Sequence, residues 1–253
     1  MTAPQIIDRN DPFSGAALYR ARLAADSKRD GFDSLETQTV RSENVASGAS
    51  TLYTVPAGKR ARTGDGVLYV SNPTGGGIAT DIHIVPSGGA AGVTNKLIPT
   101  TTFAAGSHQL LFASIWMALM PGSAIVINPG GAGLCVYGTF LEERSELCSF
   151  IGGFDDNLPA SETTLITVPA RRALAVASVV AYNDAVAART LTVHNRASGV
   201  AASAVNQILT TSINAATGYS FDLSRLPTQS EGGIVSAIGS NTQINVWISA
   251  VLY

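Results

Sequence analysis

The chain has 253 residues, of which 13% are charged, and its formal net charge is −2 at pH 7. Without an excess of basic residues there is no field to attract phosphates, so we expect no binding to nucleic acid. No apolar run approaches the ~20 residues that cross a bilayer, and the N-terminus lacks the basic and apolar segments of a secretory signal. We therefore expect no membrane contact and synthesis in the cytoplasm.

Residues 1–45 differ from the rest of the chain and predict an N-terminal arm. They hold 6 of the 16 basic and 7 of the 18 acidic residues. Good helix formers at 16–25 predict one short helix within the arm. Because such a helix is marginal in water, the arm is either a disordered tail or is ordered by docking on a partner subunit. The residues expected to dock are Leu18, Tyr19, Arg20, Arg22 and Leu23.

A seven-residue phrase then occurs twice: residues 51–57 read TLYTVPA and residues 164–170 read TLITVPA, 113 positions later. The copies also end alike, as LCVY at 134–137 and INVW at 244–247. Matches at a slightly shorter spacing of 111 are Ser87 with Ser198, Gly88 with Gly199, and Asn95 with Asn206. A tandem duplication with small changes of loop length accounts for all of these matches.

Each copy reads as a series of short strands. In the first copy, residues 66–72 and 80–85 flank a Pro/Gly turn and predict a hairpin. In the second copy, residues 175–183 and 189–194 form the matching pair. Short strands about 8 to 12 residues apart, with turn signals between them, are typical of a sandwich or jelly roll. We therefore predict an all-β fold.

The predicted organisation is two tandem, jelly-roll-like β-sandwiches at 46–144 and 161–253, joined by a solvated linker at 145–160. Limited proteolysis should cut in this linker and before residue 46. Acidic residues gather around the linker without the spacing of a calcium loop, so we expect no metal. The acidic and glycine residues concerned are Glu142, Glu143, Glu146, Asp155, Asp156, Gly152 and Gly153.

The residues that could carry chemistry do not form a catalytic pattern. His83 and His194 occupy equivalent strand positions in the two copies, which favours a role in the fold. His108 follows a serine, but no Gly-x-Ser-x-Gly elbow surrounds that serine. Asp65 and Asp81 are the nearby carboxylate pair in the first copy. We expect no catalytic residue, no cofactor and no small-molecule substrate.

Aromatic and basic side chains leave two interpretations open. The aromatic residues could stack on sugars, although repeat positions within strands favour core packing for Tyr137 and Trp247. Lys59 and Arg60 follow the first Val-Pro-Ala turn and could grip an anion. Pairing with acidic neighbours at a strand start is the favoured alternative. The other aromatic residues weighed for stacking are Tyr69, Trp116 and Tyr182.

The chain has two cysteines, too few for a disulfide framework and without histidines at metal spacing. Alternation along its strand could point Cys135 outward, while Cys148 falls in the predicted linker. Cys135 and Cys148 could therefore form a disulfide within or between subunits in an oxidising environment. Two free, partly buried thiols are the alternative.

The turns of the chain resemble those of a known group of proteins. The residues concerned are the turn at 51–60, the strand at 69–72 before its Gly/Pro turn, the turn at Ala105-Gly106, and Pro121-Gly122-Ser123 before a closing strand. Together they resemble a β-sandwich domain type of tailed-bacteriophage structural proteins, found on heads, necks and tails. The second copy departs from the pattern, since Arg171-Arg172 replace Gly58-Lys59.

This resemblance implies a non-enzymatic virion component that works by assembly, foremost a neck, collar or tail accessory protein. Head decoration is one alternative, and a glycan- or receptor-binding module is another. The partners it implies are further copies of the chain and other phage structural proteins. The low charge of the copies and the charged arm favour a closed homo-oligomer, in which the arm reaches a neighbour.

Overall fold

The computed structural model describes residues 36–111, 117–145, 149–223 and 229–253. Within these ranges the chain forms strands, and its helical segments are two three-residue 3₁₀ turns, η1 (Val93–Asn95) and η2 (Ala204–Asn206). The predicted all-β class is confirmed. In these ranges no helix is long and apolar enough to cross a membrane. The predicted arm helix, with Leu18, Tyr19, Arg20, Arg22 and Leu23, lies outside the described residues.

The first half of the chain forms two antiparallel sheets. Sheet A has the strand order β1-β9-β3-β6, and sheet B has the order β2-β8-β4-β5. The two-residue strand β7 (Ala118–Leu119) pairs with β3 beside sheet A. The bounds are β1 Glu36–Val45, β2 Ser50–Thr54, β3 Lys59–Ser71, β4 Ile78–Val85, β5 Lys96–Phe103, β6 His108–Leu111, β8 Ala124–Pro129 and β9 Leu134–Arg144.

The second half forms sheet C, ordered β10-β17-β12-β15, and sheet D, ordered β11-β16-β13-β14. Apart from β7, each half thus has its first, eighth, third and sixth strands in one sheet and its second, seventh, fourth and fifth in the other. This is a jelly-roll arrangement. The bounds are β10 Phe150–Asp155, β11 Thr163–Thr167, β12 Leu174–Asn183, β13 Arg189–Arg196, β14 Gln207–Ile213, β15 Thr217–Asp222, β16 Ile234–Gly239 and β17 Ile244–Leu252.

Two predicted boundaries require correction. Residues 36–45, assigned to the arm, form β1 against β9, and residues 150–155, assigned to the linker, form β10 against β17. Arg41 lies opposite Tyr137, and Phe154 lies opposite Trp247. The spacing of 113 therefore extends upstream of the repeated phrase into β1 and β10. Both strands were missed because β1 is exposed and charged and β10 carries two glycines.

The repeated phrase closes the same turn in each half. The Val55 N–H donates to the Ser123 carbonyl over 2.9 Å, and the Val168 N–H donates to the Gly233 carbonyl over 2.8 Å. The turn needs a left-handed residue three positions after its valine. Gly58 supplies it in the first half with a φ of 75°, and Arg171 supplies it in the second with a φ of 60°. The substitution noted in the sequence thus keeps the backbone conformation.

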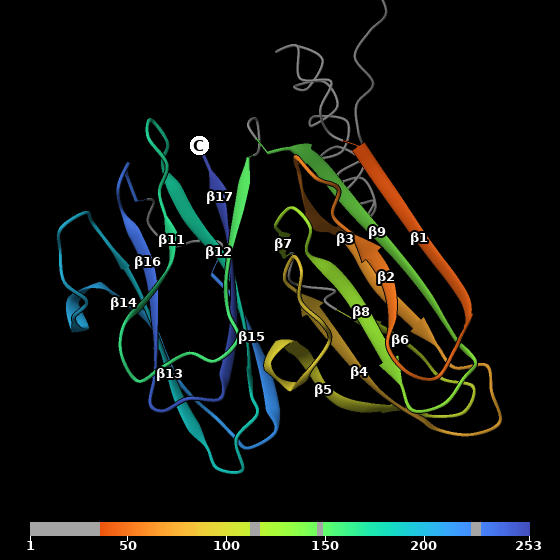
Figure 1. Ribbon diagram of the computed structural model, residues 1–253. Helices are drawn as coiled ribbons and strands as arrows, with labels where there is room; N and C mark the ends of the chain where they lie inside the picture. Colours follow the sequence, from red (N-terminus) through yellow and green to blue (C-terminus); the bar gives the residue numbers. More distant parts are fainter. Residues whose placement is uncertain (1–35, 112–116, 146–148, 224–228) are drawn as a thin grey trace, which may run out of the picture.

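Each half encloses an apolar core between its two sheets. Residues of sheets A and B, such as Phe140 and Ile82, form the first core, and residues of sheets C and D, such as Ile248 and Leu191, form the second. The first core also includes Val180 and Trp247 of sheet C. The two halves are therefore packed together by apolar side chains and lie side by side, as Figure 1 shows.

Sheet C is covered on both faces. All ten residues of β12 are buried, because one face packs on sheet D and the other on the first half. The Trp247 indole N–H donates to the Ala118 carbonyl over 2.8 Å, and the Ala118 N–H donates to Ser249 Oγ over 2.9 Å. The Asn245 side-chain amide donates to the Val93 carbonyl over 2.8 Å. The outer face of sheet C is thus a protein-binding surface within the chain.

The two glycines of β10 let other backbone approach on both sides of this strand. A Cβ at Gly152 would lie 2.7 Å from the Ala118 carbonyl oxygen, and a Cβ at Gly153 would lie 2.4 Å from the Leu165 carbonyl oxygen. We expect Gly152→Ala to reduce the free energy of unfolding by about 2 kcal/mol, because the halves must separate or shift to admit the methyl group. Urea unfolding measures the loss.

Gly76→Ala is the matched control for Gly152→Ala. A Cβ at Gly76 meets nothing within 4 Å, so the methyl group should be tolerated. Equal stabilities of the two variants would contradict the close backbone approach at β10.

Candidate functional site

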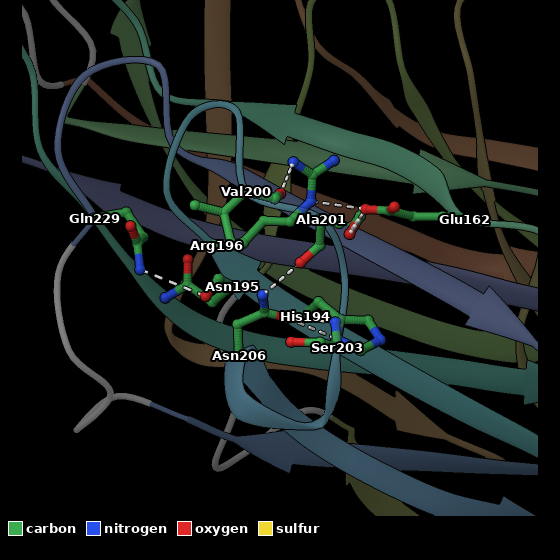
Figure 2. Close-up of polar contacts among 10 residues, drawn as sticks. Glu162, His194, Asn195, Arg196, Val200, Ala201, Ser203, Asn206 and Gln229 are labelled. Atoms are coloured by element: carbon green, nitrogen blue, oxygen red, sulfur yellow. Dashed lines mark hydrogen bonds and ion pairs between the residues drawn. The ribbon is translucent and has the colours of Figure 1, made fainter.

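The second half carries a hollow of about 550 Å³ beside β14. Its walls come from the end of β13, the loop after it, η2 and the start of β14 (Figure 2). We call it the β14 hollow and define it by Asn195, Arg196, Val200, Val205, Asn206 and Ile208.

A histidine–asparagine clamp fixes the shape of this hollow. His194 Nδ1 lies 3.0 Å from Asn206 Oδ1, which also accepts the Ser203 N–H over 3.0 Å. The Asn206 side-chain amide donates to the Ala201 carbonyl over 2.8 Å. The clamp thus ties β13 to the loop that leads into η2.

An ion pair holds the opposite wall. Arg196 Nε donates to Glu162 Oε1 over 2.8 Å, and Arg196 Nη1 donates to the Val200 carbonyl over 2.6 Å. Ser236 Oγ donates to the same carboxylate oxygen over 2.6 Å. The Ser236 hydrogen bond and then Arg196 hold the pKa of Glu162 below its usual range, although burial opposes them. The two charged groups of this wall are therefore engaged in holding its loop.

The first half repeats the clamp, but its surroundings are covered. His83 Nδ1 lies 3.1 Å from Asn95 Oδ1, and the Asn95 side-chain amide donates to the Ala90 carbonyl over 2.7 Å. Asn95, Lys96 and Leu97 face Val180, Tyr182 and Trp247 of sheet C, with about 10 Å³ of space between them. The clamp is therefore a repeated fold device, as the sequence predicted for the two histidines.

The outer face of sheet A carries a row of partly exposed side chains, which we call the aromatic row. Arg41 of β1 lies over the Tyr137 ring of β9 at 5.5 Å, and Tyr137 packs beside Tyr69 of β3 at 6.0 Å. The imidazole of His108 in β6 stacks on Tyr69 at 6.1 Å, and Leu110 of β6 is 50% exposed. The row crosses all four strands of the sheet.

The aromatic residues therefore differ in burial: some lie in the core and others on the outer face of sheet A. Trp247 is buried, as predicted for core packing, and Tyr182, weighed for stacking on sugars, is buried as well. Tyr137 and Tyr69 are not core residues, because alternation along their strands turns them to the outer face of sheet A. Trp116 lies outside the described residues.

The basic and acidic clusters are structural where the chain is described. Lys59 pairs with Glu36 over 2.7 Å and with Glu142 over 2.9 Å, in agreement with the predicted pairing at a strand start. Glu142 and Glu143, assigned to a solvated segment, are instead buried at the end of β9. Glu143 accepts the Ser149 N–H over 2.7 Å and so joins β9 to the segment before β10.

Where the structure describes them, the remaining candidates give no assembled site. Asp81 pairs with Lys96 over 3.2 Å. Among the described residues, no three His, Cys, Asp or Glu side chains lie close enough together to hold a metal ion. Cys135 is half-buried on the outer face of sheet A, whereas Cys148 lies outside the described residues. The disulfide therefore stays a prediction.

One repeated structural element was not predicted from the sequence. The buried Asn72 side-chain amide donates to the Phe103 carbonyl over 2.7 Å, and Asn183 donates to the Ile213 carbonyl over 2.9 Å. Each ties the turn after its strand to the end of β5 or β14. The predicted hairpins do not form, because β3 and β4 lie in different sheets, as do β12 and β13. The available signal was their spacing of 111, which is that of Asn95 and Asn206.

Comparisons with known proteins do not identify the chain. No protein-family model and no curated protein matches it. Solved structures that it resembles include the STIV MCP, at 12% identity over 87% of this chain and 96% of that one, with a TM-score of 0.28. The PBSX exported protein XepA follows at 9% identity, 86% of each chain and a TM-score of 0.24. A structure of infectious bursal disease virus, Gt strain, has 11% identity, 86% and 71% coverage, and a TM-score of 0.23.

Likeness at TM-scores this low carries no argument about the fold or the function of the chain.

His83 should make the chain less stable as the pH falls. Burial lowers the pKa of His83, against the hydrogen bonds to Asn95 and Gly92 and the charge of Asp81, while the charge of Lys96 lowers it further. A folded-state pKa below the unfolded value of ~6.5 means that the unfolded chain takes up the proton first. The contribution of His83 to stability is thus complete above about pH 6.5 and is lost as the pH falls.

Urea unfolding at about pH 7.5 and about pH 5 measures this effect. His83→Gln should lose less stability between the two pH values than the wild-type chain does. Equal losses would contradict the prediction, and His108→Gln controls for the loss of an exposed histidine.

Proposed function

We propose that the chain is a non-enzymatic structural protein of a tailed-bacteriophage particle and acts by packing sheet faces on other protein surfaces. One observation carries the proposal: the outer face of sheet C already works in this way, since Trp247 and Val180 join the core of the first half. The same outer face on sheet A carries the aromatic row and is partly exposed. A chain built from such faces is suited to assembly.

The resemblance of its turns supports the proposal that this assembly takes place on a phage particle, foremost as a neck, collar or tail accessory protein, with head decoration as the alternative. We further propose that the two halves are tandem sandwich domains and that the partners are copies of the chain and other virion proteins. No nucleic acid, membrane or small-molecule substrate is part of this proposal.

The test is to locate the chain in lysates of the cells that produce it. A density gradient separates DNA-filled particles from free protein, and an antibody to the purified chain detects it in each fraction. We expect the chain to sediment with the particles and to stay bound after washing in high salt. A chain found only among free proteins would overturn the proposal.

A glycan-binding module is the second candidate, because Tyr69 and Tyr137 present partly exposed rings beside Arg41. Sugars stack on such rings, so a purified glycan binder should retain host polysaccharide. Binding that Tyr69→Ala weakens would favour this second function over assembly.

A further inference from the structure

We propose that copies of this chain join head to tail, with the aromatic row of one copy seated in the β14 hollow of the next. This inference rests on the proposed function and names the surfaces through which assembly takes place. Its template is the contact between the two halves of a single chain.

The β14 hollow corresponds to a surface that is covered in the first half. Across the spacing of 111, Asn206 corresponds to Asn95 and Ile208 corresponds to Leu97. The strands that carry them are paired in the same register, because His194 lies opposite Gln207 and His83 lies opposite Lys96. In the first half this surface packs on sheet C. In the second half it lines the open hollow.

The aromatic row corresponds to the part of sheet C that covers the surface around His83 and Asn95 in the first half. Tyr137 lies between Arg41 and Tyr69 in the sheet A register. Trp247 lies in the same way between Phe154 and Val180 in sheet C. Each half therefore has two surfaces for this contact. One is the outer face of sheet A or sheet C, which inserts, and the other is the surface around its histidine–asparagine clamp, which receives such a face. In the part of the chain that the structure describes, a single pair is used, and the other pair stays open.

The open pair also holds exposed apolar side chains that the contact would cover. Val205 at the rim of the hollow is 96% exposed, and Val200 in its wall is 48% exposed. Leu110 beside the aromatic row is 50% exposed. Burying these groups against another protein surface is favourable because it removes apolar area from water.

The contact between copies should be weaker than the contact between halves. Arg41 replaces Phe154 and Tyr137 replaces Trp247 on the inserting face, while Asn195 replaces Ile84 on the receiving face. These changes make both surfaces more polar. We therefore expect reversible association of the free protein, with the contact completed where many copies are held together.

The geometry of this contact fixes the type of assembly. Two different surfaces of each copy meet, so the contact is heterologous and propagates until the rotation per copy closes a ring. A two-fold dimer would instead pair one surface with itself.

An engineered disulfide tests the contact directly. Asn245 reaches the Val93 carbonyl in the chain, and the corresponding positions are Cys135 on sheet A and Ala204 on η2. In full-length protein with Cys148→Ser, we expect Ala204→Cys to form an intermolecular disulfide with Cys135 under mild oxidation. Non-reducing electrophoresis should show dimers and higher species, which Cys135→Ser abolishes.

Val186→Cys is the matched control for the cross-link, because Val186 is 99% exposed and lies on the turn between β12 and β13, away from both surfaces. Equal cross-linking of Val186→Cys and Ala204→Cys would overturn the inference.

Sedimentation velocity from about 1 to about 100 μM gives a second measurement without a cross-link. The wild-type chain should associate, and Val205→Arg should weaken association at least about tenfold, because a charge then enters an apolar contact. Val205 is exposed, so the variant should fold, and Val186→Arg should associate like the wild type.

A chain that stays monomeric throughout this range and gives no specific cross-link would overturn the head-to-tail contact. If that chain still sediments with particles, the proposed function stands without it. A chain that cross-links as expected but is absent from particles would instead support the contact and overturn the proposed function.

Discussion

Trp247→Ala should lower the free energy of unfolding by about 3 to 5 kcal/mol, the usual cost of removing a large buried aromatic side chain. The Trp247 side chain is 3% exposed, packs beside Phe154 at 4.9 Å and donates its indole N–H to the Ala118 carbonyl. Its removal leaves a cavity where sheet C meets the first half and an unpaired carbonyl beside it. We expect the two halves to unfold at separate midpoints in this variant.

Tyr137→Ala is the matched control for Trp247→Ala, because Tyr137 occupies the corresponding position in sheet A. Its side chain is partly exposed, so we expect a loss of about 1 kcal/mol. Trp247→Phe keeps most of the apolar volume and should cost less than Trp247→Ala. Calorimetry and urea unfolding measure all three variants. A single transition at the wild-type midpoint for Trp247→Ala would contradict the packing of the halves.

These two residues also show how far the sequence can predict this fold. The repeat aligned Tyr137 with Trp247 correctly, and alternation placed both on one face of a strand. The alternation of residues along a strand does not indicate which part of the protein covers each face of the sheet. Among the described residues, the first half covers the outer face of sheet C and the second half does not cover that of sheet A, so equivalent aromatic residues became core in one half and surface in the other. That difference arises from packing between halves, which local sequence patterns do not encode.

Edge strands mark a second limit of the sequence analysis. β1 pairs on one side with β9 and is otherwise exposed, so its polar residues lack the alternation of a half-buried strand. β10 is covered on both faces, but close approach of backbone requires Gly152 and Gly153 there, and adjacent glycines are typical of a linker. The histidine pair was predictable because each member has an equivalent partner, Asn95 or Asn206, at the same distance along the chain.

The first half contains a buried polar group that the second half lacks. Glu142 is 2% exposed and accepts hydrogen bonds from the Tyr53 hydroxyl over 2.7 Å and from Lys59 Nζ over 2.9 Å. Glu142 lies opposite Ala61 as Leu252 lies opposite Leu174, and the repeated phrase aligns Tyr53 with Ile166. Leu252 and Ile166 both belong to the second core. The same place in the fold thus accepts either a polar network or an apolar pair.

Glu142→Leu alone should destabilise the chain by about 3 kcal/mol, because it leaves the buried Tyr53 hydroxyl without a partner and removes one partner of Lys59. Adding Tyr53→Ile recreates the apolar pair of the second half. The double variant should therefore lose at least about 1 kcal/mol less than the sum of the two single variants. Additive losses in urea unfolding would contradict the coupling of Tyr53 with Glu142.

The same network predicts how stability changes at alkaline pH. Burial, and then the hydrogen bond to Glu142, raises the pKa of Tyr53, while hydrogen bonds to Glu36 and Glu142 raise the pKa of Lys59. Because both folded-state pKa values lie above the unfolded values of about 10, the folded chain keeps these protons longer. Their contribution is complete below about pH 10 and is lost as the pH rises. Tyr53→Phe removes the tyrosine part of this loss and leaves the Lys59 part, so its stability should fall less between about pH 9 and about pH 11 than that of the wild type. An unchanged loss would show that Tyr53 ionises as readily in the folded chain as in the unfolded one.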